Sequence, residues 1–124
     1  MRLATYVPEG TTQTECVVTV LGGDAGGVAA NINRWAAQLG RAPLSDAEVA
    51  ALPRWPMLDT EAVVFEAGTS DSDGEAIRFI GVICPVPHHT VFIRLVGPHP
   101  EVEAERERFR TFCESFRIEE APAE

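Results

Sequence analysis

The chain contains no lysine, so all ten of its basic residues are arginines. Against 19 acidic residues they give a formal net charge of -9. The absence of lysine has two interpretations, codon bias in a GC-rich genome or adaptation of the proteome to salt. In either case an acidic domain repels polyanions, which argues against nucleic acid and anionic membranes as partners.

Long apolar runs are also absent. No stretch reaches the roughly 18 apolar residues that a membrane-spanning helix needs. The first ten residues, MRLATYVPEG, contain no apolar core of signal-peptide length. The sequence therefore predicts no membrane span and a cytoplasmic location, and a longer precursor would leave export or lipid anchoring open.

Cysteine is scarce and unpaired in spacing. The chain has Cys16, Cys84 and Cys113, and no CxxC motif. An odd count without paired spacing argues against a disulfide framework and against a zinc knuckle. All three lie in apolar stretches, so we expect buried free thiols. His88 and His89 are adjacent and would point to opposite faces of a strand, so they do not predict a metal site. No cofactor is predicted.

What is present suits one compact domain. The hydrophobic fraction of 45% is enough for a core. A length of 124 residues is too short for two domains. We expect a single domain over residues 1–120 and a frayed tail over 121–124. Strands joined mostly as hairpins, with helices between and after them, predict an antiparallel β-sheet flanked by helices, the α+β class.

Alternating or β-branched apolar runs predict the strands. They are expected at residues 1–8, 14–21, 57–68, 75–85 and 88–98. In the fourth of these, Ile77, Phe79, Val82 and Cys84 are expected to point inward. The segment between Pro53 and Pro56 is expected to be a rigid connection that holds Trp55.

The first helix is specified at both ends and along one face. Its apolar stripe consists of Val28, Ile32, Trp35 and Leu39. Asp24 is expected to cap its N-terminus, and Gly40 fits the position just past its end, where φ is positive.

Two further helices are expected. Ser45 and Glu48 match a capping box, which predicts a short helix over 46–52. The last helix is expected to begin near Pro100. Its apolar face consists of Val102, Phe109, Phe112, Cys113 and Phe116. Three pairs at i,i+3 are expected on its outside: Glu103–Arg106, Glu105–Arg108 and Glu107–Arg110.

Several segments together resemble a known group of proteins. They are MRLATY, GGDAGGVAANINRWAAQLG, a strand hairpin followed by GP, and FCESFRI. The chain resembles small uncharacterised bacterial proteins with a GGxxANxNRWxxQxG signature, which look like the PsbP-like fold. That fold is shared by an accessory subunit of photosystem II and by a nuclear-import factor that binds the GTPase Ran. The resemblance implies an antiparallel sheet flanked by helices and a partner-binding, non-catalytic role. The chain departs from the pattern at Ala36 and Ala37 and at Arg94, which takes a lysine's place.

The glycine-rich stretch GGDAGG raises the question of a phosphate-binding loop. It matches neither GxGxxG nor GxxxxGK[ST], and it lacks the lysine and hydroxyl residue of the latter. Asp24 places negative charge where a phosphate needs the opposite. The stretch is therefore interpreted as a turn that requires positive φ.

The candidate site is a polar strip on the first helix, formed by Asn31, Arg34 and Gln38, with Trp55 as a further candidate. The strip either recognises a ligand or partner, or bonds loop carbonyls or a local acid and so locks the helix onto the sheet. The five donors of Arg34 suit a carboxylate. Trp55 either caps the core or forms an exposed contact.

No catalytic constellation is found, since a Cys84/His88 pair has no supporting local motif. The leading hypothesis is a non-catalytic accessory or protein-binding module. The alternative is a small-ligand-binding domain with a polar pocket near Arg34. Ala30 and Ala37 form a small-residue outer face that could admit a second copy of the chain in a homo-oligomer.

Overall fold

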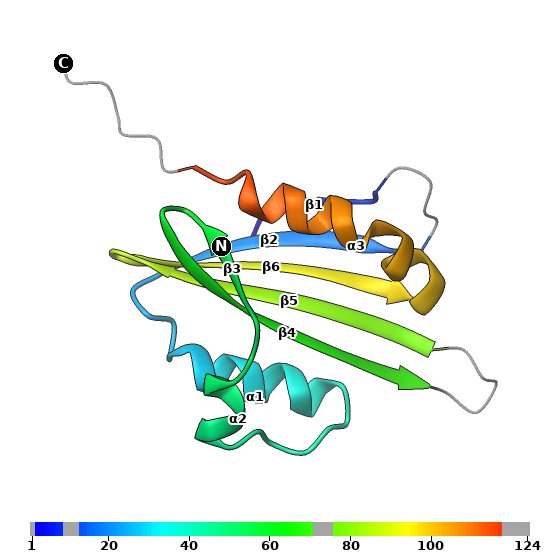
Figure 1. Cartoon of the computed structure of the whole chain (residues 1–124), viewed down its shortest axis with the longest axis horizontal. Coiled ribbons are helices and arrows are strands. Elements are labelled where there is room, and N and C mark those ends of the chain that lie inside the picture. The colour runs from blue at the N-terminus through cyan, green and yellow to red at the C-terminus, as the bar shows by residue number, and fades with distance from the viewer. Residues whose placement is uncertain (1, 9–12, 71–75, 118–124) are drawn as a thin grey trace.

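The computed structural model describes residues 2–8, 13–70 and 76–117 (Figure 1). In these ranges six strands form one antiparallel sheet, in the order β1-β2-β6-β5-β4-β3. Helix α3 lies on one face of the sheet, and α1 and α2 lie on the other (Figure 1). The α+β class and the antiparallel sheet flanked by helices are confirmed.

The structure contains six strands and three helices in the described residues. The strands are β1 (Arg2–Tyr6), β2 (Glu15–Gly22), β3 (Arg54–Met57), β4 (Thr60–Ser70), β5 (Ala76–Val86) and β6 (His89–Pro98). The helices are α1 (Val28–Gln38), α2 (Asp46–Ala50) and α3 (His99–Glu114). In the part of the chain that the structure describes, no helix is long and apolar enough to cross a membrane. The tail expected at 121–124 lies outside the described residues.

Strand β6 joins the two halves of the chain. It lies between β2 and β5, so Leu95 pairs with Cys16 on one side and with Ile80 on the other. Helices cover both faces of the sheet, so successive residues of a central strand enter different cores. On β2, Cys16 and Val18 pack in the core beneath α3, and the alternating Val17 faces α1.

This two-sided burial changes one expectation. Phe79 belongs to the core beneath α1, whereas Val82 and Cys84 belong to the core beneath α3. The expectation that Ile77 points inward is wrong, because its side chain is 38% exposed. Ile77 lies near the start of β5 and pairs with Pro98, at the end of the neighbouring strand β6.

The segment around Trp55 is a strand rather than a connection. Residues 54–57 form β3, which pairs antiparallel with β4 through a turn in which Leu58 and Asp59 have φ values of 53° and 63°. Trp55 and Met57 alternate inward into the core beneath α3, and Pro56 is exposed. The expected rigid connection was wrong because β3 is the edge strand of the sheet, and an edge strand tolerates proline.

The C-terminal end of α1 and the N-terminal end of α2 are as expected. Gly40 has φ 71°, its N–H donates to Ala37 O at 3.0 Å, and the N–H of Arg41 donates to Ala36 O at 2.8 Å. These two bonds form a Schellman motif. Ser45 and Glu48 form the capping box of α2, which ends at Ala50, slightly before the expected position.

Helix α3 begins at His99, one residue before the expected proline, and buries Val102, Phe109 and Cys113. Phe112 and Phe116 are partly buried and pack against the same core. The expected pairs Glu103–Arg106 and Glu105–Arg108 are present at 2.8 and 3.4 Å. The expected pair Glu107–Arg110 was wrong, because Arg110 instead bonds Glu114, one turn further along, at 2.7 Å.

Candidate functional site

The glycine-rich loop is a turn that is bound to the neighbouring hairpin. Gly23, Ala25, Gly26 and Gly27 all have positive φ, between 53° and 94°. The N–H of Gly23 donates to His88 O at 2.8 Å, and the hydroxyl of Thr90 donates to Gly23 O at 2.8 Å. The loop is therefore fixed against the turn between β5 and β6.

Asp24 does not cap α1 as expected. The N-cap is Gly27, which has no side chain, and a carboxylate oxygen of Asp24 accepts from the N–H of Gly26 at 3.2 Å. The expectation was wrong because the backbone remains at positive φ over Ala25, Gly26 and Gly27, so α1 begins only at Val28.

Asn31 bonds loop carbonyls, which is one of the two alternatives that the sequence left open for the polar strip. Its side chain is only 4% exposed. The amide nitrogen donates to Ala25 O at 2.9 Å and to Gly27 O at 2.7 Å. Asn31 thus satisfies the carbonyls of the loop that leads into α1 and takes no part in an open surface.

Arg34 and Gln38 lie on the exposed side of α1 and border two cavities. The first cavity is about 130 Å³ in volume. It is lined by Arg34 and Trp35 of α1, by Val17, Thr19 and Leu21 of β2, and by Phe92 and Arg94 of β6.

The second cavity, of about 280 Å³, adjoins the first. It is lined by Gln38 and Leu39 beside α1, by Glu15 and Val17 of β2, by Phe79 of β5, and by Arg94 and Val96 of β6. Val17 and Arg94 line both cavities, so the two form one depression between α1 and the β2–β6 pair. We name it the α1 groove.

Positive charge gathers in the first cavity. Arg34 and Arg94 both line it, and no carboxylate of a described residue does. Among the described residues, neither guanidinium takes part in an ion pair or a hydrogen bond. Sequence reasoning found Arg34 but gave Arg94 no role, because the position of Arg94 depends on the long-range pairing of β6 with β2.

Trp55 lies on the other face of the sheet, away from the α1 groove. Its side chain is 6% exposed and packs edge-on against Phe109, with ring centroids 6.0 Å apart. The guanidinium of Arg110 lies 5.3 Å from the centroid of the indole. Of the two alternatives for Trp55, the structure shows the one in which it belongs to the core.

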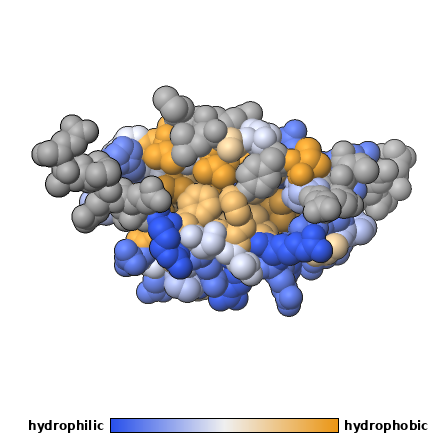
Figure 2. All heavy atoms as spheres, turned by 90° about the horizontal axis from the view of Figure 1, so that it is seen from above, coloured by the Kyte–Doolittle hydropathy of each residue, from blue (hydrophilic) through white to orange (hydrophobic). Residues whose placement is uncertain are grey.

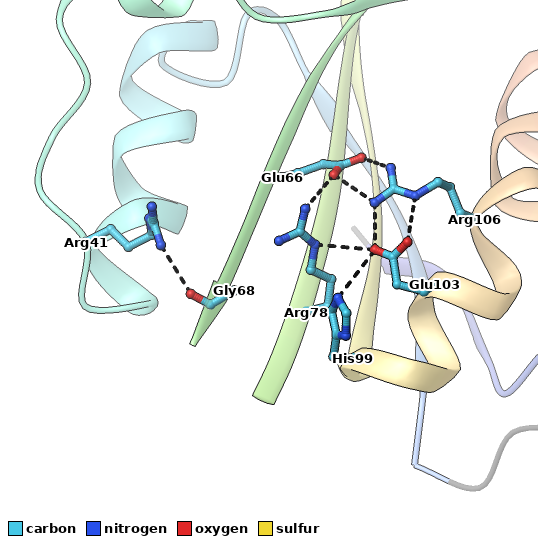
Figure 3. A network of polar contacts seen from close by, with 7 residues as sticks. All are labelled: Arg41, Glu66, Gly68, Arg78, His99, Glu103 and Arg106. Atoms are coloured by element: carbon cyan, nitrogen blue, oxygen red, sulfur yellow. Dashed lines mark hydrogen bonds and ion pairs between the residues drawn. The ribbon is translucent and has the colours of Figure 1, made fainter. Parts of the chain in front are cut away.

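A network of ion pairs joins α3 to the sheet (Figure 3). Glu66 of β4 accepts from Arg78 of β5 at 2.8 Å, and both nitrogens of the Arg106 fork donate to the same carboxylate. Arg106 also contacts Glu103, which faces His99 at 3.7 Å. The i,i+3 rule predicted only the Glu103–Arg106 part, since Glu66 is distant in sequence.

The charged groups in this network shift one another's pKa values. Burial of Glu66 favours its neutral form, but hydrogen bonds from Arg106 and Arg78 outweigh burial and lower its pKa. The hydrogen bond from Arg106 likewise lowers the pKa of Glu103. The two carboxylates raise the pKa of Arg106. The network thus attaches α3 to β4 and β5, on the face opposite the α1 groove.

The three cysteines are buried free thiols, as expected. Burial raises the pKa of Cys84 to about 11, and its sulfur contacts Met57 O at 3.6 Å. Burial also raises the pKa of Cys113. Within residues 2–8, 13–70 and 76–117, no group of three or more His, Cys, Asp or Glu side chains is placed to hold a metal ion.

Comparison of the chain with protein-family models gives no match, and comparison with curated proteins gives none either.

Proposed function

We propose that this protein is a non-catalytic binding domain that holds a small ligand in the α1 groove. The observation that carries the proposal is that exposed polar residues of α1, Arg34 and Gln38, line adjoining cavities against the sheet, which supplies Arg94. Pockets that combine apolar walls with a few polar groups are the usual form of small-ligand sites.

The fate of the other candidate residues supports the same choice. An exposed contact at Trp55 would have favoured a protein partner, and this side chain is buried. Asn31 is committed to loop carbonyls. Arg34 and Gln38 therefore remain as the candidates that are open to a ligand.

The walls of the groove are closely packed and hydrogen-bonded. Trp35 is 3% exposed and packs edge-on against Phe79 and Phe92, at centroid distances of 5.0 and 6.2 Å. The Schellman motif fixes the end of α1, and Asn31 fixes its start. A site whose walls are already ordered loses little conformational entropy on binding.

The absence of a catalytic role is part of the proposal. The Cys84 thiol is buried and contacts a backbone carbonyl, and burial keeps it protonated near neutral pH. A nucleophilic cysteine needs a lowered pKa and an adjacent base.

We also propose that the fold is PsbP-like. Support comes from the antiparallel sheet with helices on both faces and from the GGDAGGVAANINRWAAQLG signature, which forms the loop and α1. An experimental structure of this chain, superposed on PsbP-like domains, tests the assignment through strand order and helix placement.

An NMR screen tests the binding function. The ¹⁵N-labelled 124-residue chain is titrated with a panel of acetate, hexanoate, hexylamine and hexanamide. Shifts that cluster at the amides of Thr19, Arg34 and Gln38 are expected from at least one probe. Gln38→Ala should reduce them, whereas Gln13→Ala, another exposed glutamine, should not. Shifts confined to other parts of the chain would contradict a site in the α1 groove.

A protein partner remains a second candidate function, favoured by the face that carries α3. A cavity of about 280 Å³ lies between α3 and the sheet, and Leu95, Phe109 and Phe112 form much of its wall. Figure 2 looks onto this face and shows hydrophobic side chains gathered at its centre, with hydrophilic ones along one border.

A pull-down from the native host tests this second candidate. Phe112→Arg should abolish capture of a partner that uses the α3 face. Ala104→Arg, at an exposed position on the same helix, should not. Circular dichroism of both variants checks that they fold. Equal capture by both variants would remove the second candidate.

A further inference from the structure

We propose that the α1 groove selects a small organic anion, with its carboxylate held between Arg34 and Arg94 and a short apolar chain in the adjoining cavity. This inference rests on the proposed function and names the class of ligand. It starts from the position of two arginines, one on the helix and one on the sheet, that border the same space.

The charge around the first cavity favours an anion. Two guanidinium groups at one cavity repel each other, and an anion between them removes this cost. No acidic residue in the described part of the chain lines the first cavity, to which Arg34 and Arg94 both belong. On the opposite face, by contrast, Arg78 and Arg106 are neutralised by Glu66 and Glu103. Arg34 and Arg94 thus differ from Arg78 and Arg106, because no described carboxylate forms an ion pair with them.

The hydrogen-bond donors of Arg34 and Arg94 favour a carboxylate. Each guanidinium presents five N–H donors in a planar fork that matches a carboxylate. Neither Arg34 nor Arg94 donates to any group in the described ranges. Thr19 adds a hydroxyl to the same cavity. A carboxylate at this position can therefore accept charge-assisted hydrogen bonds from both sides of the groove.

Arg94 has apolar neighbours on the sheet. Its partners in register are Val17 on β2 and Gly81 on β5. Gly81 has no side chain, and the indole of Trp35 fills the space above it. Arg94 thus lies between a valine and a tryptophan, in surroundings where apolar walls strengthen its attraction to an anion.

The second cavity has room for an apolar chain of the ligand. Beyond Arg94 the groove continues into the second cavity, whose apolar lining includes Leu39, Phe79 and Val96. A short alkyl chain attached to the carboxylate would bury its surface there. Glu15 also lines this cavity and disfavours a second negative charge. The groove should therefore prefer a monocarboxylate with an apolar chain to a dicarboxylate of the same length.

Isothermal titration of the 124-residue chain tests the inference, with hexanoate as the main probe. Its matched partners are hexanamide, which lacks the charge, adipate, which adds a second carboxylate, and inorganic phosphate, which lacks the chain. Hexanoate is expected to bind most tightly, and its affinity should fall as salt is added.

The variants Arg34→Gln and Arg94→Gln should each weaken hexanoate binding by about tenfold or more, because each removes a charge-assisted interaction. Arg54→Gln is the matched control, since Arg54 is exposed on β3, outside the groove, and should leave the affinity unchanged. Arg34 lies on the solvent side of α1, so its variant should fold normally even if Arg94→Gln does not.

Several results would overturn the inference. Equal affinity for hexanoate and hexanamide, with shifts in the groove, would refute the anion and leave the binding function standing. Phosphate bound as tightly as hexanoate would refute the apolar chain. If none of these probes and none of the screening panel shifts the groove amides, both the inference and the proposed function fail.

Discussion

The indole of Trp35 lies directly against the backbone of Gly81, in the core beneath α1. A methyl group built on Gly81 would lie 2.3 Å from Cζ3 of Trp35 and 2.6 Å from Cε1 of Phe79. The glycine on β5 therefore lets the tryptophan of α1 pack onto the sheet, and this contact sets the position of the helix that forms one wall of the α1 groove.

Gly81→Ala should accordingly destabilise the protein by about 1–3 kcal/mol, the usual cost of overpacking a core. Urea unfolding followed by tryptophan fluorescence measures the change in the free energy of unfolding. Gly22→Ala is the control, because a methyl group there meets nothing within 4 Å, and it should change stability by less than about 0.5 kcal/mol. Equal effects of the two substitutions would contradict the packing argument.

Asn31 and Arg34, although neighbours on one polar strip, should respond differently to truncation. Asn31→Ala removes the side-chain donor to Ala25 O and Gly27 O, of which only Gly27 O keeps the backbone N–H of residue 31, and should cost about 1–3 kcal/mol. Arg34→Ala removes an exposed side chain and should stay within about 0.5 kcal/mol. Thermal or urea unfolding of the two variants in parallel measures the contrast. A large loss of stability in Arg34→Ala would mark Arg34 as structural.

These cases show how far the sequence predicts this fold. Features set by a few neighbouring residues were predicted well, as with the Schellman glycine Gly40 and the capping box of Ser45 and Glu48. Their physics is local, because each satisfies the free backbone groups of one helix end. The N-cap assigned to Asp24 failed because it depended on backbone angles of the following loop, which composition alone does not fix.

The candidate site was only half predictable for a related reason. Helical spacing identified Arg34 and Gln38 as neighbours on one face of α1. Arg94 joins them only because β6 lies beside β2, and strand order is a property of the whole sheet. The edge position of β3, which explains the burial of Trp55, is another long-range property.

The network around Glu66 should make stability depend on pH. Burial opposes ionisation of Glu66, but the hydrogen bonds from Arg106 and Arg78 prevail and lower its pKa below the ordinary value of a glutamate. The folded state then binds fewer protons at Glu66 than the unfolded state does. Its contribution to stability is complete above the unfolded-state pKa and is lost as pH falls through the lowered value.

Glu66→Gln should therefore cost about 1–3 kcal/mol at pH 7, and the difference from wild type should narrow as pH falls below about 4.5. Glu61→Gln, an exposed position on the same strand, provides the control and should show little effect at either pH. Urea unfolding at several pH values gives the two curves. A difference that grows on acidification would show that Glu66 does not act through its charge.

The thiols should resist alkylation while the protein is folded. Cys16, Cys84 and Cys113 are all at most 2% exposed, and burial raises the pKa of Cys84 to about 11. At pH 8 the thiolate, which is the reactive form, is therefore rare at Cys84, and the reagent cannot reach it. Mass spectrometry after iodoacetamide treatment should find no label in buffer and three labels in denaturing urea. Rapid labelling of Cys84 in buffer would instead indicate an accessible, activated thiol and would reopen the case for catalysis.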